Sequence, residues 1–233
     1  MIDWHTHVLP RMDDGSRSVE ESVAMLAALA AEGVSDVVAT PHFYANRESL
    51  DSFLSRREGA YTALFAALSA SLPRVRLGAE VAYYGGISKL EGLERLAICG
   101  TRVLLLELPF TRWTDYMIQE VLAITRTRGL VVVLAHVERY LSFGKDRALA
   151  ALCREGVLAQ ANAFAFGGVL RARPALRLLR TGCIQLLGSD AHNMTSRPPR
   201  LLPAYRRIER ALGTDFAREM AAFGTRLLAK ENR

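Results

Sequence analysis

Short apolar runs alternate with longer amphipathic stretches along the whole chain. Several runs, such as Val103–Leu108 and Leu130–Val137, are nearly continuous in Val, Leu and Ile, which is typical of strands covered on both faces. The pattern predicts strands over Ile2–His7, Ser35–Thr40, Val75–Val81, Val103–Leu108, Leu130–Val137, Val157–Asn162 and Ile184–Asp190.

The stretches between these runs carry helix signals. In the first, Ser18 and Glu21 have the spacing of a capping box, and Gly33 follows where the helix should end. The pattern predicts helices over Ser18–Ala31, Ser49–Ser71, Asp115–Arg128, Asp146–Arg154, Pro174–Thr181, Leu201–Leu212 and Asp215–Lys230.

Strand–helix alternation over the whole length is typical of an α/β fold built from β–α units around a parallel sheet. Seven such units suit a closed (β/α)7 barrel better than an open sheet, although periodicity alone does not decide closure. No linker rich in Pro, Gly or Ser divides the sequence. We therefore expect a single domain over residues 1–233.

Composition narrows the class of protein. Half of the 233 residues are hydrophobic and 23% are charged, which excludes a disordered tail, a collagen-like chain and a disulfide scaffold. No apolar run approaches the roughly 20 residues that cross a bilayer, and the best candidate, Leu130–Ala135, is the size of a buried strand. The start, MIDWHTHVLP, lacks the basic and apolar regions of a secretory signal. We expect a cytoplasmic protein without membrane insertion, in which an oligomer is left open.

The net charge of +6 comes mainly from arginine. A basic balance is compatible with nucleic-acid binding, but the arginines are scattered and form no stripe interleaved with aromatic residues. We therefore expect a solvated basic surface and no nucleic-acid partner.

The cysteines, Cys99, Cys153 and Cys183, are odd in number and have no CxxC spacing. This usage favours reduced thiols over a disulfide framework or a zinc cluster. None is followed by an arginine six positions later, so the phosphate-binding loop of cysteine-dependent phosphatases is absent. We expect the three to be packing residues.

Every histidine in the sequence falls at, or just after, the carboxyl end of a predicted strand. In a parallel barrel these ends share one rim, where active sites are built. Three acidic residues occupy equivalent places. The candidate set at this rim is therefore His5, His7, His42, His136 and His192 with Glu80, Glu107 and Asp190.

The spacing of this set favours metal binding. His5 and His7 are two residues apart, which on a strand turns both imidazoles to one side. Asp190 and His192 repeat the spacing. Imidazole and carboxylate without thiolate suit Zn, Mn or Fe(II), and this many donors suit two or three ions.

For single members of the set, a structural role is an alternative. His42 taken alone is simplest as a hydrogen-bonded core residue, and Glu80 as a partnered structural carboxylate. However, Glu80 and Glu107 lie in apolar strands, where a carboxylate without partners is costly to bury. A metal cluster accounts for all of them together.

Other candidates carry weaker signals. Asp13, Asp14 and Gly15 are typical of a turn, although an Asp there would also reach across the rim as a ligand. Asn162 ends a predicted strand and suits a supporting or turn role.

Arg139 and Arg197 follow strand ends, where a guanidinium is suited to bind a phosphate with two parallel hydrogen bonds. The alternative is that both are ordinary surface arginines.

Taken in order, these motifs resemble the polymerase and histidinol phosphatase (PHP) superfamily. They are HTH at 5–7, MDDG at 12–15, TPH at 40–42, GAE at 78–80, the Glu107 strand, AHVERY at 135–140 and SDAHN at 189–193. Within this superfamily, the chain resembles the capsule-biosynthesis branch, the CpsB/YwqE-type metal-dependent protein tyrosine phosphatases. The motifs that carry this resemblance are MIDWHTHVLP at the start, GAE, HVERY, and SDAHN followed by RPP.

The resemblance implies a distorted seven-stranded (β/α) barrel with two or three divalent ions, most often Mn, with Fe or Zn as alternatives. Arg139 and Arg197 would bind the substrate phosphate, and His192 or a nearby acid would protonate the leaving oxygen. By this resemblance, one ion is held by His5, His7, Glu80 and Asp190, a second by Glu80, Glu107 and His136, and a third by Asp14, His42 and His192.

The implied activity is hydrolysis of phosphotyrosine on proteins by metal-activated water, with a bacterial tyrosine kinase of capsule or exopolysaccharide synthesis as the substrate. The 43–51 segment varies within the family, so the substrate itself is left open. Three alternatives remain: a small-molecule phosphatase such as one for histidinol phosphate, a DNA-processing PHP domain, and a non-catalytic metal-dependent regulator. A DNA-processing domain predicts a basic groove or further domains, and the sequence shows neither. A non-catalytic regulator is disfavoured because the set of metal donors is intact.

Overall fold

The structure is a computed structural model of the chain and describes residues 1–143 and 146–229. Within these residues the strands are β1 (Ile2–Thr6), β2 (Asp36–Ala39), β3 (His42–Phe43), β4 (Arg74–Leu77), β5 (Glu80–Ala82), β6 (Val103–Glu107), β7 (Val131–Leu134), β8 (Leu158–Asn162) and β9 (Leu186–Gly188). The α-helices are α1 (Val19–Ala31), α2 (Leu50–Phe65), α3 (Asp115–Arg128), α4 (Asp146–Arg154), α5 (Val169–Arg180), α6 (Leu202–Leu212) and α7 (Thr214–Ala229).

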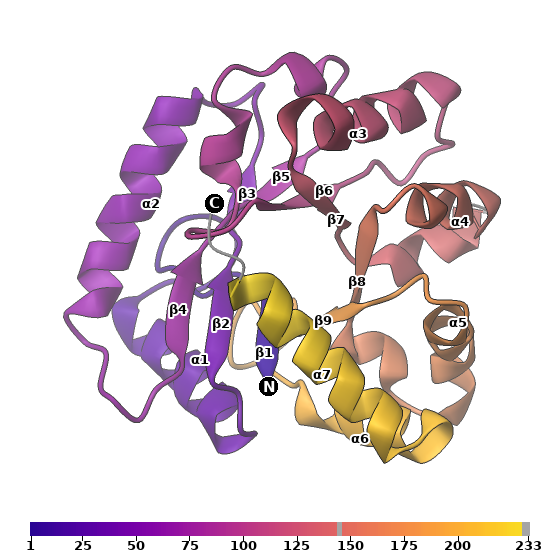
Figure 1. Cartoon of the computed structure of the whole chain (residues 1–233). Coiled ribbons are helices and arrows are strands. Elements are labelled where there is room, and N and C mark those ends of the chain that lie inside the picture. The colour runs from indigo at the N-terminus through magenta and orange to yellow at the C-terminus, as the bar shows by residue number, and fades with distance from the viewer. Residues whose placement is uncertain (144–145, 230–233) are drawn as a thin grey trace.

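All strand pairs are parallel, and they form two sheets, in the orders β1-β2-β4 and β3-β5-β6-β7-β8-β9. The strands curl around a common centre, with helices outside them (Figure 1). The end of β1 meets the segment after β9: Thr6 and Ala191 form a parallel bridge, and the Asp190 amide donates to the His5 carbonyl at 2.8 Å. The expected parallel α/β class is confirmed, as a curled half-barrel whose pairing is divided between two sheets.

The division into two sheets arises where neighbouring strands are interrupted together. Pro41, between β2 and β3, has no N–H to donate to a ladder. The expected strand Val75–Val81 breaks into β4 and β5 at Gly78 and Ala79. The amide of Gly78 still donates to the Ala39 carbonyl, and the amide of Glu80 donates to the Pro41 carbonyl. The segment of β4 and β5 therefore stays hydrogen-bonded to the segment of β2 and β3, although β4 and β5 belong to different sheets.

Most helices lie where the sequence predicts them. The Ser18 side chain accepts from the Glu21 amide and caps α1, while α3 and α4 have the expected bounds. Helix α2 ends at Phe65, before the expected Ser71. Helix α5 begins at Val169 and contains Pro174, although proline favours the first turn of a helix. The expected end of the last helix, Lys230, lies outside the described residues.

The inner face of the strands carries its own apolar cluster. Trp4, Leu105 and Val133 belong to it, and α7 contributes Leu227 and Leu228. Helix α7 packs against β1 and β9, and Figure 1 shows it crossing this part of the sheet. None of the helices in the described part of the chain is both long and apolar enough to cross a membrane.

The cysteines occupy different environments. All three are free; Cys183 is buried and Cys153 is half-buried, as packing residues should be. Cys99 is exposed, so the expectation of a packing role is wrong for it, because the residue lies after a 3₁₀ turn rather than inside an element.

Gly188, at the end of β9, allows the close approach of β1. A Cβ there would lie 2.5 Å from the Cβ of His5 and 2.8 Å from Nε2 of Gln160. We expect Gly188→Ala to lower the free energy of unfolding by about 1–3 kcal/mol because the surrounding backbone must shift. Urea unfolding of the metal-free protein measures this.

Gly59 provides the matched control, because a Cβ there meets no atom within 4 Å and the residue lies inside α2. We expect Gly59→Ala to raise the free energy of unfolding by up to about 1 kcal/mol. Equal stability of the Gly188→Ala variant and the wild type would show that the approach of the two strands is not tight.

Candidate metal centre

The first strand delivers two imidazoles to one point. Both His5 and His7 are buried, and their Nε2 atoms lie 3.2 Å apart. Two nitrogens directed at each other at this distance need a shared proton or a shared cation. The spacing on β1 therefore has the effect that the sequence predicts.

Glu80 and Asp190 meet these histidines from other strands. Oε2 of Glu80, the first residue of β5, lies 3.2 Å from Nε2 of His5 and 3.4 Å from Nε2 of His7. Oδ1 of Asp190, two residues beyond β9, lies 3.6 and 3.5 Å from the same atoms. Two imidazoles and two carboxylates thus converge, and these four residues form the first donor group.

The second donor group shares Glu80. Nε2 of His136, after β7, lies 2.9 Å from Oε1 of Glu80 and 3.3 Å from Oε1 of Glu107, at the end of β6. Glu80 therefore turns one oxygen to each group.

The third donor group lies at the open edge of the cluster. Oδ1 of Asp14, an exposed residue, lies 3.6 Å from Nε2 of His42 and 3.4 Å from Nε2 of His192. The His192 ring is centred 3.9 Å from that of His7, which connects this group to the first. All nine sequence-predicted donors are therefore brought together.

The backbone is strained at two of these residues. His136 and Asp190 have φ values of 35° and 54°, in the left-handed region that residues other than Gly adopt only rarely. Each such residue costs on the order of 1–3 kcal/mol, and strain of this kind gathers at functional sites. In both cases it turns the side chain inward just after a strand ends.

Burial and neighbouring charges set the protonation of the cluster. Burial lowers the pKa of His136, but its hydrogen bonds to Glu107 and Glu80 prevail and raise that pKa to about 9. Burial raises the pKa of Glu80, yet the charge of His5 and hydrogen bonds from His136 and His42 hold it well below its usual range. Without metal, the site thus holds protons between ionised carboxylates, and a cation that binds there must displace them.

His192 differs from the other histidines. Burial and the charges of His7 and Arg197 lower its pKa to about 4. Its Nδ1 lies 3.0 Å from the Asp190 carbonyl, an acceptor, so Nδ1 carries the proton and the Nε2 lone pair is free. Nε2 is buried without a hydrogen bond among the described residues, as is Nδ1 of His136. A buried nitrogen without a hydrogen bond beside a carboxylate, as Nε2 of His192 is beside Asp14, fits a site for a divalent cation.

Two supporting residues were not predicted as such. Oδ2 of Asp13 accepts from Nδ1 of His7 at 2.7 Å and from the His42 amide at 2.9 Å. Oε1 of Gln160 lies 3.2 Å from Nδ1 of His5 and accepts from the His136 amide at 2.8 Å. Such bonds at Nδ1 turn Nε2 toward the cluster. A buried glutamine between Ala159 and Ala161 in strand β8 was the available signal.

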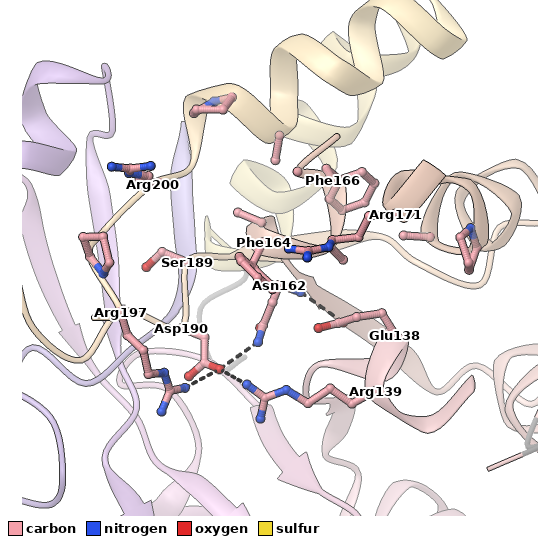
Figure 2. Close-up of a pocket in the computed structure, with 18 of the residues that line it drawn as sticks. Glu138, Arg139, Asn162, Phe164, Phe166, Arg171, Ser189, Asp190, Arg197 and Arg200 are labelled. Atoms are coloured by element: carbon pink, nitrogen blue, oxygen red, sulfur yellow. Dashed lines mark hydrogen bonds and ion pairs between the residues drawn. The ribbon is translucent and has the colours of Figure 1, made fainter. Parts of the chain in front are cut away.

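Two arginines lie beside the cluster. The Nη2 atoms of Arg139 and Arg197 are each 2.7 Å from Oδ2 of Asp190, and Nδ2 of Asn162 is 2.7 Å from the same oxygen (Figure 2). Asp190 thus turns Oδ1 to the histidines and Oδ2 to the arginines. The side chains of Arg139 and Arg197 are 40% and 38% exposed, so a ligand can reach both of them.

Aromatic rings border the site on another side. Phe110 stacks on His136, with ring centres 5.7 Å apart, and Tyr44 lies 5.3 Å from His42. The Arg47 guanidinium lies over the Tyr44 ring at 4.3 Å. The 43–51 segment, singled out from the sequence, therefore contacts the cluster directly through Tyr44.

Comparisons with known proteins agree on one family. The model of the family described as capsular polysaccharide synthesis, CpsB/CapC, matches residues 1–227. The tyrosine-protein phosphatase CpsB of Streptococcus pneumoniae is 31% identical over 237 residues, covering 94% of each chain. The tyrosine-protein phosphatase YwqE of Bacillus subtilis is 28% identical over 221 residues, covering 92% of this chain and 86% of YwqE.

The fold is also found among solved structures. One matching chain comes from the crystal structures of YwqE from Bacillus subtilis and CpsB from Streptococcus pneumoniae, which are described as metal-dependent tyrosine phosphatases. It superposes on this chain with a TM-score of 0.85. The identity is 24%, and the match covers 100% of this chain and 96% of that one.

Proposed function

This chain belongs to the CpsB/CapC family of capsular polysaccharide synthesis, and on that premise we propose that it is a metal-dependent protein tyrosine phosphatase. Its reaction is the hydrolysis of phosphotyrosine on proteins. The observation that carries the proposal is the convergence of nine imidazole and carboxylate donors beside two partly exposed arginines.

The donor set fits divalent ions, and we assign the three donor groups described above as their sites. Mn is the proposed metal, with Fe or Zn as alternatives, because the donors are nitrogen and oxygen without thiolate. Bound divalent ions lower the pKa of water and polarise phosphoryl oxygens, which is the chemistry that phosphomonoester hydrolysis requires.

Arg139 and Arg197 bind the substrate phosphate in this proposal. Both already donate to one carboxylate oxygen of Asp190, and a phosphate presents the same acceptor chemistry with more charge. The guanidiniums would orient the phosphoryl group and stabilise the negative charge that develops on it during transfer.

For His192 the geometry favours a metal-ligand role over that of a proton donor. Its Nδ1 proton is held by the Asp190 carbonyl, and its low pKa leaves no proton on Nε2 at neutral pH. The phenolate of tyrosine is a good leaving group and needs little protonation, so the reaction does not depend on His192 as an acid.

We further propose that the two sheets form one distorted (β/α)7 barrel in a single domain, supported by the bridge between β1 and the end of β9. The proposed substrate is a bacterial tyrosine kinase that regulates capsule or exopolysaccharide synthesis, supported by the family description. A cytoplasmic location is proposed because the three cysteines are free, as in a reducing compartment.

The test is phosphate release from a phosphotyrosyl peptide, compared with a phosphoseryl peptide of the same sequence and with histidinol phosphate. We expect kcat/KM to be highest for the phosphotyrosyl peptide, by about 10-fold or more, because the tyrosyl oxygen leaves readily. A preference for histidinol phosphate would retain the metal chemistry and refute the protein substrate.

A further inference from the structure

A cavity of about 1040 Å³ lies beside the two arginines, at the carboxyl ends of β7, β8 and β9. We call it the rim pocket. Arg139, Arg197 and Asp190 line the side next to the metal centre, and Arg171 and Arg200 line the other side (Figure 2). Its volume is at the upper end of the roughly 300–1,000 Å³ typical of small-molecule sites. It therefore holds much more than a phosphate group.

The charges that line the rim pocket do not cancel. It has four arginines and two carboxylates, Glu138 and Asp190. Asp190 already forms ion pairs with Arg139 and Arg197, and the Glu138 carboxylate accepts a hydrogen bond from the backbone N–H of Asn162. Arg171 and Arg200 are exposed, and neither makes an ion pair within residues 1–143 and 146–229. The pocket therefore carries a positive charge that a ligand can match.

Arg171 is also held in position. Its guanidinium lies 4.3 Å from the centre of the Phe164 ring, which is 72% exposed at the border of the pocket. A cation stacked on an aromatic face keeps its N–H groups free in the plane of the guanidinium. Phe166 and Pro174 add apolar surface nearby. The wall thus combines free donors with surface for aliphatic groups.

We propose that the rim pocket binds acidic side chains next to the phosphotyrosine of the substrate, with Arg171 and Arg200 as specificity residues. The inference rests on the proposed function, since a phosphate bound at Arg139 and Arg197 leaves the adjoining peptide at the wall of this pocket. Side chains of Asp or Glu match its charge, and their methylene groups match its apolar surface.

The effect should lie in substrate binding rather than in the chemical step. Arg171 and Arg200 line the side of the pocket away from Asp190 (Figure 2), so in this proposal they bind ground state and transition state equally and change KM more than kcat. Exposed ion pairs are individually weak, so two pairs together give about a 10-fold preference. Salt should reduce this preference because it screens exposed charges.

The experiment uses two phosphotyrosyl peptides, one with aspartates and one with lysines around the phosphotyrosine, and para-nitrophenyl phosphate, which has no flanking residues. The full-length protein is compared with an Arg171→Glu/Arg200→Glu variant. Arg173→Glu is the matched control, because Arg173 is exposed on the same helix but does not line the pocket.

We expect the wild type to prefer the acidic peptide about 10-fold in kcat/KM, the double variant to prefer the basic peptide, and Arg173→Glu to behave as the wild type. All three should hydrolyse para-nitrophenyl phosphate equally. The proposed role of the pocket would be overturned if the wild type had the same kcat/KM for both peptides, or if Arg173→Glu changed the preference as much as the double variant does. If the wild type hydrolysed none of the three substrates, the proposed function would be refuted, and the proposed role of the pocket would be refuted together with it.

Discussion

His136→Asn is expected to reduce phosphotyrosyl hydrolysis at least about 100-fold and to remove metal from the protein. His136 lies between Glu80 and Glu107, at 2.9 and 3.3 Å, and it is the single imidazole of the second donor group. Loss of residues that merely support a ligand already costs about 10–100-fold in affinity or activity. Loss of the ligand itself should cost at least as much.

Asparagine is the suitable replacement because residue 136 has a φ of 35°, a conformation that asparagine tolerates better than alanine does. The measurements are kcat/KM and metal content by elemental analysis, with circular dichroism as the check on folding. A folded variant that keeps both its metal and its activity would show that His136 is not a ligand.

Arg197→Ala is expected to lower kcat/KM about 100-fold while leaving the metal content unchanged. Its Nη2 touches Asp190 only through Oδ2, the oxygen that faces away from the histidines. The Arg197 carbonyl, which accepts from the His192 amide, is retained in any variant. The loss should therefore reflect the missing guanidinium and its stabilisation of phosphoryl charge.

Arg197→Lys provides the matched comparison, because it keeps the charge and loses the planar pair of donors. We expect it to recover about 10-fold of the loss. Arg206→Ala, an exposed position on α6, controls for net charge. If Arg197→Ala and Arg206→Ala turn over para-nitrophenyl phosphate equally well, Arg197 does not bind the phosphate.

The rim of donors could be predicted because a parallel sheet imposes a simple rule. All its strands end on the same side, so polar residues that terminate apolar runs must meet there. His5 and Asp190 are far apart in sequence, yet Nε2 of His5 and Oδ1 of Asp190 lie 3.6 Å apart. Each histidine followed an apolar run, and the rule needed no knowledge of the loops.

Features that depend on local geometry could not be predicted in this way. Asp13 and Asp14 are adjacent in one turn, yet Asp13 supports His7 from behind while Asp14 faces His42 and His192. Periodicity shows which residues are buried but does not show which hydrogen bond a buried side chain makes. For that reason the role of Gln160 and the change of sheet at Pro41 emerged only from the structure.

The central claim is that the histidine cluster hydrolyses phosphotyrosine only when it holds divalent ions. The most direct measurement is phosphate release from a phosphotyrosyl peptide while Mn²⁺ is added back to metal-free protein. We expect activity near background without metal and saturation at two or three ions per chain, as the donor groups allow. Full activity of the metal-free protein in the presence of a chelator would contradict the claim.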